Sequence, residues 1–136
     1  MSTTEEVQGP ALASTGPTPA AQGKAPLVAT IFDLDFGVIV RVEGEAVVVG
    51  IETLGFACAR VTARRAPLAV LDLAELTFLS SLGMGQLVRL SRDMFRWGGR
   101  VKLAGCRPVI REALETARLG CFFEFTASVE EAVPAA

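Results

Sequence analysis

Hydrophobic and polar residues alternate along residues 31–42, and this pattern predicts two strands. Phe32, Leu34 and Phe36 are separated by acidic residues, the period-2 signal of a half-buried strand. Gly37 follows as a turn, and valines then occupy every second position of the segment 38–42. The two segments therefore predict an antiparallel hairpin at the edge of a sheet.

The spacing changes to that of a helix after Glu45. Apolar residues recur there at intervals of three, four and three, at Ile51, Leu54, Cys58 and Val61. Residues at these intervals share one face of an α-helix. The cations of Arg64 and Arg65 are favourable at a helix C-terminus, so we expect the helix to end there.

The second half of the chain alternates predicted strands with predicted helices. The run LAVLDL at 68–73 is typical of a central strand covered on both faces. The elements expected after it are a helix from Ser80 to the Gly98-Gly99 stop, a strand at 101–105, a helix at 108–118, a strand at 122–125 and a short helix opening at Ser128. This order predicts an α/β sheet that is parallel in its second half.

The first 26 residues differ in composition from the rest. They are rich in Pro, Gly, Thr, Ser and Ala and hold almost no bulky apolar side chain. Such a segment buries too little surface to offset its ordering entropy, so we predict a disordered tail over 1–26 and a single folded domain over 27–136.

Two residue types are absent from the sequence, and their absence limits the kinds of catalytic and metal-binding site that the chain can form. The chain contains no His and no Tyr. This excludes Ser-His and Cys-His nucleophilic sites and His-ligated metal centres within one chain, and we predict no enzyme, no catalytic residue, no metal site and no cofactor. The formal net charge of −2 does not suggest a nucleic-acid partner, and the densest basic group is Arg60, Arg64 and Arg65.

The cysteines and the N-terminus bear on the compartment. Cys58, Cys106 and Cys121 are widely spaced and odd in number, so we expect reduced thiols, mostly in the core. No apolar run approaches the ~20 residues that cross a bilayer. Glu5 and Glu6 stand where a signal peptide has a basic region. These features predict a cytoplasmic protein with no direct membrane insertion.

Ser80 and Ser81 are the candidate functional residues. We expect them at the carboxyl end of the central strand, where the chain turns into a helix and where functional groups of α/β sheets collect. One serine can simply cap the helix. The other interpretation is a phosphoacceptor, because a phosphate at that point meets the positive end of the helix dipole.

The segment from Val70 to Gly85, VLDLAELTFLSSLGMG, resembles the signature of STAS domains, the family of bacterial anti-sigma-factor antagonists. The segments 42–45 (VEGE), 98–105 (GGRVKLAG) and 120–133, and the helix with Pro108, are also similar to that family. The resemblance extends over about residues 35–133. It implies a mixed sheet of four to five strands with helices mainly on one face.

The resemblance also implies a role in partner switching. The unphosphorylated domain would bind an anti-sigma factor that is itself a serine kinase, and phosphorylation would separate the two. Ser81 occupies the position of the phosphorylated serine, and Ser80 is the less favoured acceptor. Leu82 and Met84 would complete the partner-binding patch with the two serines. The family usually has an acidic residue before the serine, where this chain has Ser80.

Two alternatives remain open at this point. The first is a STAS accessory subunit of an ABC-type membrane transporter, which binds an ATPase subunit in the cytoplasm and needs no phosphorylation. The second is a small enzyme or ligand-binding domain of the same fold, which the absent residue types disfavour.

Overall fold

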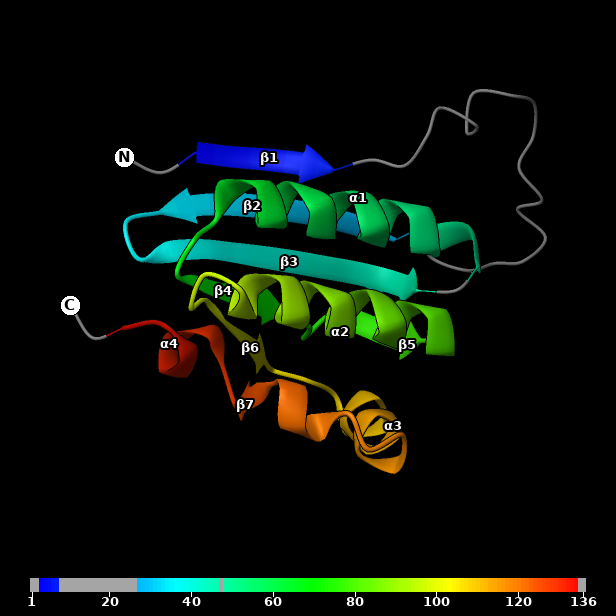
Figure 1. The fold of residues 1–136 in the computed structure, drawn as a ribbon. Coiled ribbons are helices and arrows are strands. Elements are labelled where there is room, and N and C mark those ends of the chain that lie inside the picture. Colours follow the sequence, from blue (N-terminus) through cyan, green and yellow to red (C-terminus); the bar gives the residue numbers. More distant parts are fainter. Residues whose placement is uncertain (1–2, 8–26, 47, 135–136) are drawn as a thin grey trace, which may run out of the picture.

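A computed structural model describes residues 3–7, 27–46 and 48–134 and shows one mixed sheet with helices packed on it (Figure 1). The strands are β1 (Thr3–Val7), β2 (Val28–Leu34), β3 (Gly37–Ala46), β4 (Leu68–Asp72), β5 (Leu76–Leu79), β6 (Arg100–Ala104) and β7 (Glu124–Thr126). The helices are α1 (Val48–Arg64), α2 (Ser81–Phe95), α3 (Pro108–Thr116) and α4 (Val129–Ala132), with a 3₁₀ turn η3 at Gly120–Phe122.

The strand order is β1-β2-β3-β4-β6-β7, and β5 pairs with β3 outside this path. The pairs β1–β2 and β2–β3 are antiparallel. The pairs β3–β4, β4–β6 and β6–β7 are parallel. The predicted α/β class, the hairpin at Gly37 and the parallel second half are therefore confirmed. The expected place of this hairpin at the edge of the sheet is wrong, because β1 pairs with β2 and forms that edge.

The number of strands differs from the expected four to five, because the described residues form seven. The two additional strands are β1 and β5. The expected tail over 1–26 is wrong for residues 3–7, which pair along their whole length with β2. Val7 is buried there, and Glu5 reaches the arginines of α1, so this short polar segment is anchored by its neighbours. The predicted tail over 8–26 lies outside the described residues.

The helices lie mainly on one face, as expected: α1 and α2 run side by side across the sheet (Figure 1). The main core lies under them and takes alternate residues of the central strands, including Val40 and Leu71. The opposite face carries a smaller cluster in which Ala132 of α4 meets Leu68 and Val70. The run at 68–73 is therefore covered on both sides, as its unbroken apolar character predicts.

The buried face of β2 is the reverse of the predicted one. Ala29 and Ile31 point into the main core, whereas Phe32 is only half-buried. Asp33 follows on the same side as Ile31, and Arg64 of α1 donates to its carboxylate. An ion-paired carboxylate can lie on the helix side of the sheet, so the alternation of acidic and apolar residues alone does not identify the buried face.

Candidate partner-binding surface

The start of α2 is held against the end of β3 by the short strand β5. The backbone N–H of Ser80 donates to the carbonyl of Ala46 at 3.0 Å, directly after β5 has paired with the last residues of β3. From the sequence, the serines were expected at the end of the central strand 68–73. They are instead separated from β4 by β5, which carries the chain beyond β4 before the helix begins.

The two adjacent serines have different surroundings. Ser80 is the N-cap of α2, and its Oγ accepts a hydrogen bond of 3.2 Å from the backbone N–H of Gly83. Ser81 is the first residue of the helix and is exposed. The expectation that one serine caps the helix is confirmed, and the capping residue is Ser80.

The other two residues of the expected patch also differ. Leu82 is 62% exposed, which leaves its side chain accessible to a partner. Met84 is half-buried and packs against the main core. The structure therefore brings Ser81 and Leu82 together on the surface, while Met84 contributes mainly to packing.

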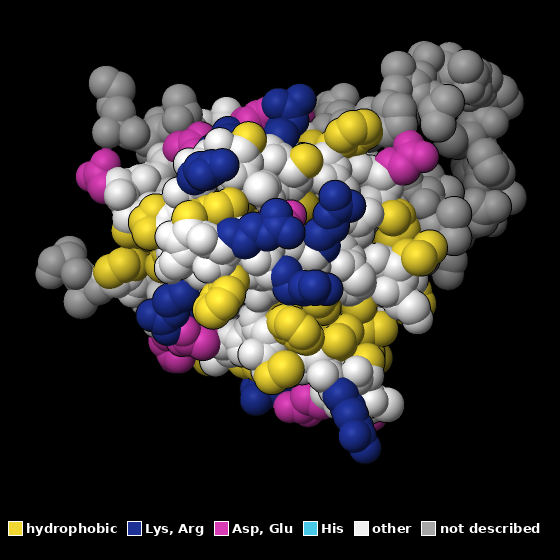
Figure 2. Space-filling model, viewed as in Figure 1, with side chains coloured by type: hydrophobic (Ala, Val, Ile, Leu, Met, Phe, Trp, Pro, Cys, Tyr) yellow, Lys and Arg dark blue, Asp and Glu magenta, His cyan; other side chains and the backbone are white. Residues whose placement is uncertain are grey.

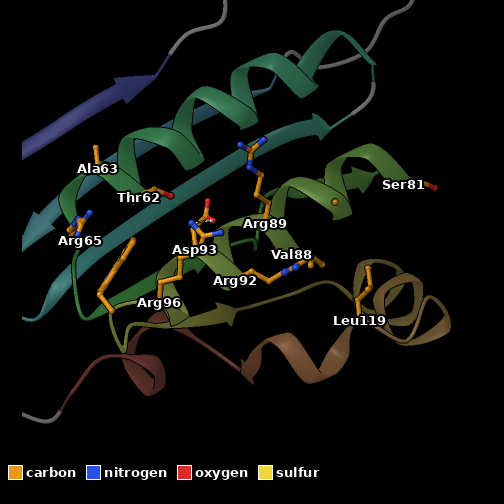
Figure 3. Close-up of a pocket in the computed structure, with 12 residues that line it drawn as sticks. Thr62, Ala63, Arg65, Ser81, Val88, Arg89, Arg92, Asp93, Arg96 and Leu119 are labelled. Atoms are coloured by element: carbon orange, nitrogen blue, oxygen red, sulfur yellow. Dashed lines mark ion pairs between the residues drawn. The ribbon is translucent and has the colours of Figure 1, made fainter.

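A groove of about 970 Å³ extends from Ser81 along the exposed side of α2 to the end of α1 (Figure 3). Arg89 and Arg92 of α2 line it, with Arg96 from the C-cap of α2 and Arg65 from just beyond α1. This group was not predicted from the sequence. Its signal is the spacing of three and four residues, which puts basic side chains on the helix face opposite Leu87, Leu90 and Met94.

Trp97 connects the segments that follow α1 and α2 at one end of this groove. Its indole N–H donates to the carbonyl of Ala66 at 2.9 Å, and the guanidinium of Arg65 lies over the ring at 5.6 Å from its centroid. Asp93 supplies a carboxylate among the arginines, and its Oδ1 lies 3.9 Å from Nη1 of Arg96. The groove is thus mainly cationic, with one acidic group inside it.

The three arginines of the densest basic group in the sequence, Arg60, Arg64 and Arg65, do not share one surface in the structure. Arg64 donates to Asp33 at 2.7 Å and to Glu5 at 2.6 Å. Arg60 pairs with the other oxygen of Glu5 at 2.6 Å. These two arginines attach β1 and β2 to α1, and Arg65 alone of the group faces the groove.

The cysteines offer no activated nucleophile where a shift is resolved. Burial raises the pKa of the Cys58 thiol to about 12, and the charge of Asp93 adds to the effect. Burial also raises the pKa of Cys106 to about 11, although Arg111 opposes the shift. All three cysteines are free. Only Cys58 is fully buried and Cys121 is exposed, so the expectation that most lie in the core is wrong.

The described residues contain neither a metal-binding cluster of acidic, Cys or His side chains nor a membrane-spanning helix. No cluster of three or more His, Cys, Asp or Glu side chains that could hold a metal ion occurs in residues 3–7, 27–46 and 48–134. Within these same ranges, every helix is too short or too polar to span a bilayer.

The family model for the STAS domain matches residues 28–132. This range includes the strands β2 to β7 and all four helices, and leaves out only β1 of the described elements. This chain belongs to the STAS domain family. No curated protein sequence matches it.

Solved structures share the STAS fold of this chain. An anti-sigma factor antagonist from Mycobacterium paratuberculosis has a TM-score of 0.70 at 24% identity, with 78% of this chain and 90% of that chain covered. The anti-sigma factor antagonist SpoIIAA in its unphosphorylated form has a TM-score of 0.66 at 21% identity, with 76% of this chain and 91% of that chain covered. The phosphorylated form of SpoIIAA, a Bacillus cell fate determinant, has a TM-score of 0.58 at 23% identity, with 73% of this chain and 89% of that chain covered.

Proposed function

We propose that this STAS domain is a cytoplasmic regulatory protein that binds a partner, an anti-sigma factor with serine kinase activity, through the loop and helix that start at Ser80. Phosphorylation of Ser81 separates the two proteins. The observation that carries this proposal is the difference in hydrogen bonding and exposure between the two serines. Ser80 uses its hydroxyl in the helix cap, whereas Ser81 presents an exposed hydroxyl one residue later.

The local electrostatics support a phosphate on Ser81. The first turn of α2 contains no acidic residue, so no carboxylate opposes the added charge there. The N-terminus of a helix carries partial positive charge and backbone N–H groups that favour an anion. A phosphoryl group at this position can therefore form without loss of the fold.

The same phosphate would act against a bound partner. It adds about −1.5 to −2 charge at neutral pH beside the exposed Leu82. A partner surface that covers Leu82 would have to remove water from this charge, which costs several kcal/mol unless new cations pair with it. The relative SpoIIAA is known in both unphosphorylated and phosphorylated forms, and this agrees with a switch of this type.

The test is intact mass and phosphopeptide mapping of the protein purified from its own cells, beside two variants. Ser81→Ala removes the proposed acceptor. Ser80→Asp removes the neighbouring hydroxyl and keeps an N-cap acceptor, so the helix start is preserved. We expect one phosphate in the wild type and in Ser80→Asp, and none in Ser81→Ala.

Two results would contradict the proposal. A phosphate that persists in Ser81→Ala and disappears in Ser80→Asp would assign the acceptor to Ser80. No phosphate under any growth condition would remove the switch and favour a constitutive partner, such as the ATPase subunit of an ABC-type transporter.

A further inference from the structure

The exposed side of α2 carries a line of arginines with few partners. Arg89, Arg92 and Arg96 follow one another at intervals of three and four residues and span about 10 Å of the helix axis. In the part of the chain that the structure describes, Arg89 and Arg92 make no ion pair or side-chain hydrogen bond. Arg96 has only the long contact with Asp93, and its side chain is 80% exposed.

This positive charge is local, because the whole chain has a formal net charge of −2. Figure 2 shows basic side chains gathered over α1 and α2 in the middle of the helical face. Arg65, Arg89, Arg92 and Arg96 line the groove together with one carboxylate, that of Asp93. Such a local excess of positive charge favours a negatively charged ligand.

The shape and the neighbours of the line favour a protein over a small anion. The three arginines are spaced along the helix axis beside a long open groove (Figure 3). Phe95, on the same helix, is 80% exposed, and Leu82 is 62% exposed near the start of the helix. Exposed aromatic side chains beside arginines are the composition of the cores of protein–protein interfaces, where both residue types carry much of the binding energy.

We propose that the groove between α1 and α2 binds an acidic, partly apolar segment of a partner protein, with its carboxylates on Arg89, Arg92 and Arg96. The apolar side chains of the segment lie on Phe95, which lines an adjoining hollow together with Arg92 and Arg96. This inference rests on the proposed function, for which it names the chemistry of the partner. Ser81 lines the same groove, so a phosphate there opposes the acidic segment directly. The phosphate would therefore weaken binding by repulsion along the groove.

The experiment uses the full chain and a fluorescein-labelled, 14-residue helical peptide with Glu on one face and Leu and Phe on the other. A peptide with Lys in place of each Glu is the control ligand. Anisotropy is measured in about 50 mM NaCl, where the Debye length of ~14 Å exceeds the distance of about 12 Å between Ser81 and Arg89 along the helix.

Two double variants change the net charge equally. Arg89→Glu/Arg92→Glu reverses two cations of the groove, and Arg111→Glu/Arg118→Glu reverses two exposed cations on and just after α3. We expect the groove variant to bind the acidic peptide at least about tenfold more weakly, and the α3 variant to stay within about twofold of the wild type. Circular dichroism of both variants verifies that they are folded.

Other outcomes would overturn the inference. Equal losses in the two double variants would mean that binding follows net charge alone. Tighter binding to vesicles containing phosphatidylglycerol than to the peptide would identify a membrane surface. Self-association in size-exclusion chromatography that disappears in Arg89→Glu/Arg92→Glu would identify a second copy of this chain.

Variants of Ser81 separate this inference from the proposed function. Ser81→Glu is expected to weaken peptide binding several-fold, and an unchanged affinity would remove the link between the groove and the switch. The unphosphorylated wild-type protein is expected to bind the peptide. If it does so and no phosphate is ever found in cells, the kinase-driven switch fails while the acidic-segment site stands.

Discussion

The hydroxyl oxygen of Ser80 accepts a hydrogen bond from the backbone N–H of Gly83 at 3.2 Å. This bond satisfies one of the free N–H groups at the start of α2 and occupies the hydroxyl of Ser80. Ser81, the next residue, has its side chain on the surface. A single cap thus assigns a structural role to one serine and leaves the other accessible to an enzyme.

Ser80→Ala should lower the free energy of unfolding by about 1 kcal/mol, because the cap is lost. Ser81→Ala, at an exposed position, should change it by less than about 0.5 kcal/mol. Ser80→Asp should retain most of the stability, since Asp is an equally good cap. Urea denaturation followed by circular dichroism measures all three, and equal losses for the two alanine variants would refute the assignment of the cap.

Gly83→Ala should destabilise the protein, whereas Gly85→Ala should stabilise it. A Cβ on Gly83 would lie 2.6 Å from Cδ1 of Leu79 and 3.3 Å from Cβ of Ala46, in a closely packed contact between α2 and the sheet. Overpacking of this kind costs about 1–3 kcal/mol, of which a gain of ~1 kcal/mol in helix propensity offsets part.

Gly85 is the matched control for this comparison. It lies in the same helix, but a Cβ there would have no atom within 4 Å. Only the propensity gain of about 0.5–1 kcal/mol remains. Thermal unfolding of the two variants gives the signs, and an increase in Tm for Gly83→Ala would show that the contact with Leu79 is looser than described.

Arg64→Ala should destabilise the protein by about 1–3 kcal/mol and release β1 from the sheet. Arg64 donates to both Asp33 and Glu5, and all three side chains are only a quarter to a third exposed. Arg60 pairs with Glu5 through a side chain that is 56% exposed, so Arg60→Ala should cost less than about 1 kcal/mol. Hydrogen exchange of residues 3–7 is expected to accelerate in Arg64→Ala, and unchanged protection would show that backbone pairing alone holds β1.

Stability should decrease at alkaline pH partly because of Cys58. Its pKa is about 12 in the folded protein and about 9 in an unfolded chain, so above pH 9 the unfolded state loses a proton that the folded state retains. The stabilisation is complete below pH 9 and is lost as pH rises towards 12, at about 1.4 kcal/mol per pH unit.

Cys58→Ala tests this pH dependence. The variant is expected to be less stable at neutral pH because it leaves a cavity, but its free energy of unfolding should fall less steeply between pH 9 and 11. Denaturation curves at four pH values across this window give the two slopes. Parallel slopes would show that Cys58 ionises as readily in the folded protein as in the unfolded chain.

Most local elements of this STAS domain could be predicted from the sequence because their signals are local. The period of three and four residues at Ile51, Leu54 and Cys58 specifies a helix wherever it packs, and the apolar run at 68–73 specifies a strand buried on both faces. The strands β1 and β5 escaped prediction because β1 is polar except for Val7 and β5 is only four residues long. Each exists through pairing with a neighbour that is distant in sequence.

The candidate site divides in the same way. The sequence by itself determined that a serine would cap the helix after Leu79, because capping depends on residues only three apart. Only the tertiary structure decided which serine remains exposed, which face of β2 is buried and which arginines line a groove. Those properties depend on contacts between elements, such as the packing of α1 beside α2 that brings Arg65 close to the arginines of α2 and the pairing of Arg64 with Asp33 across 31 residues.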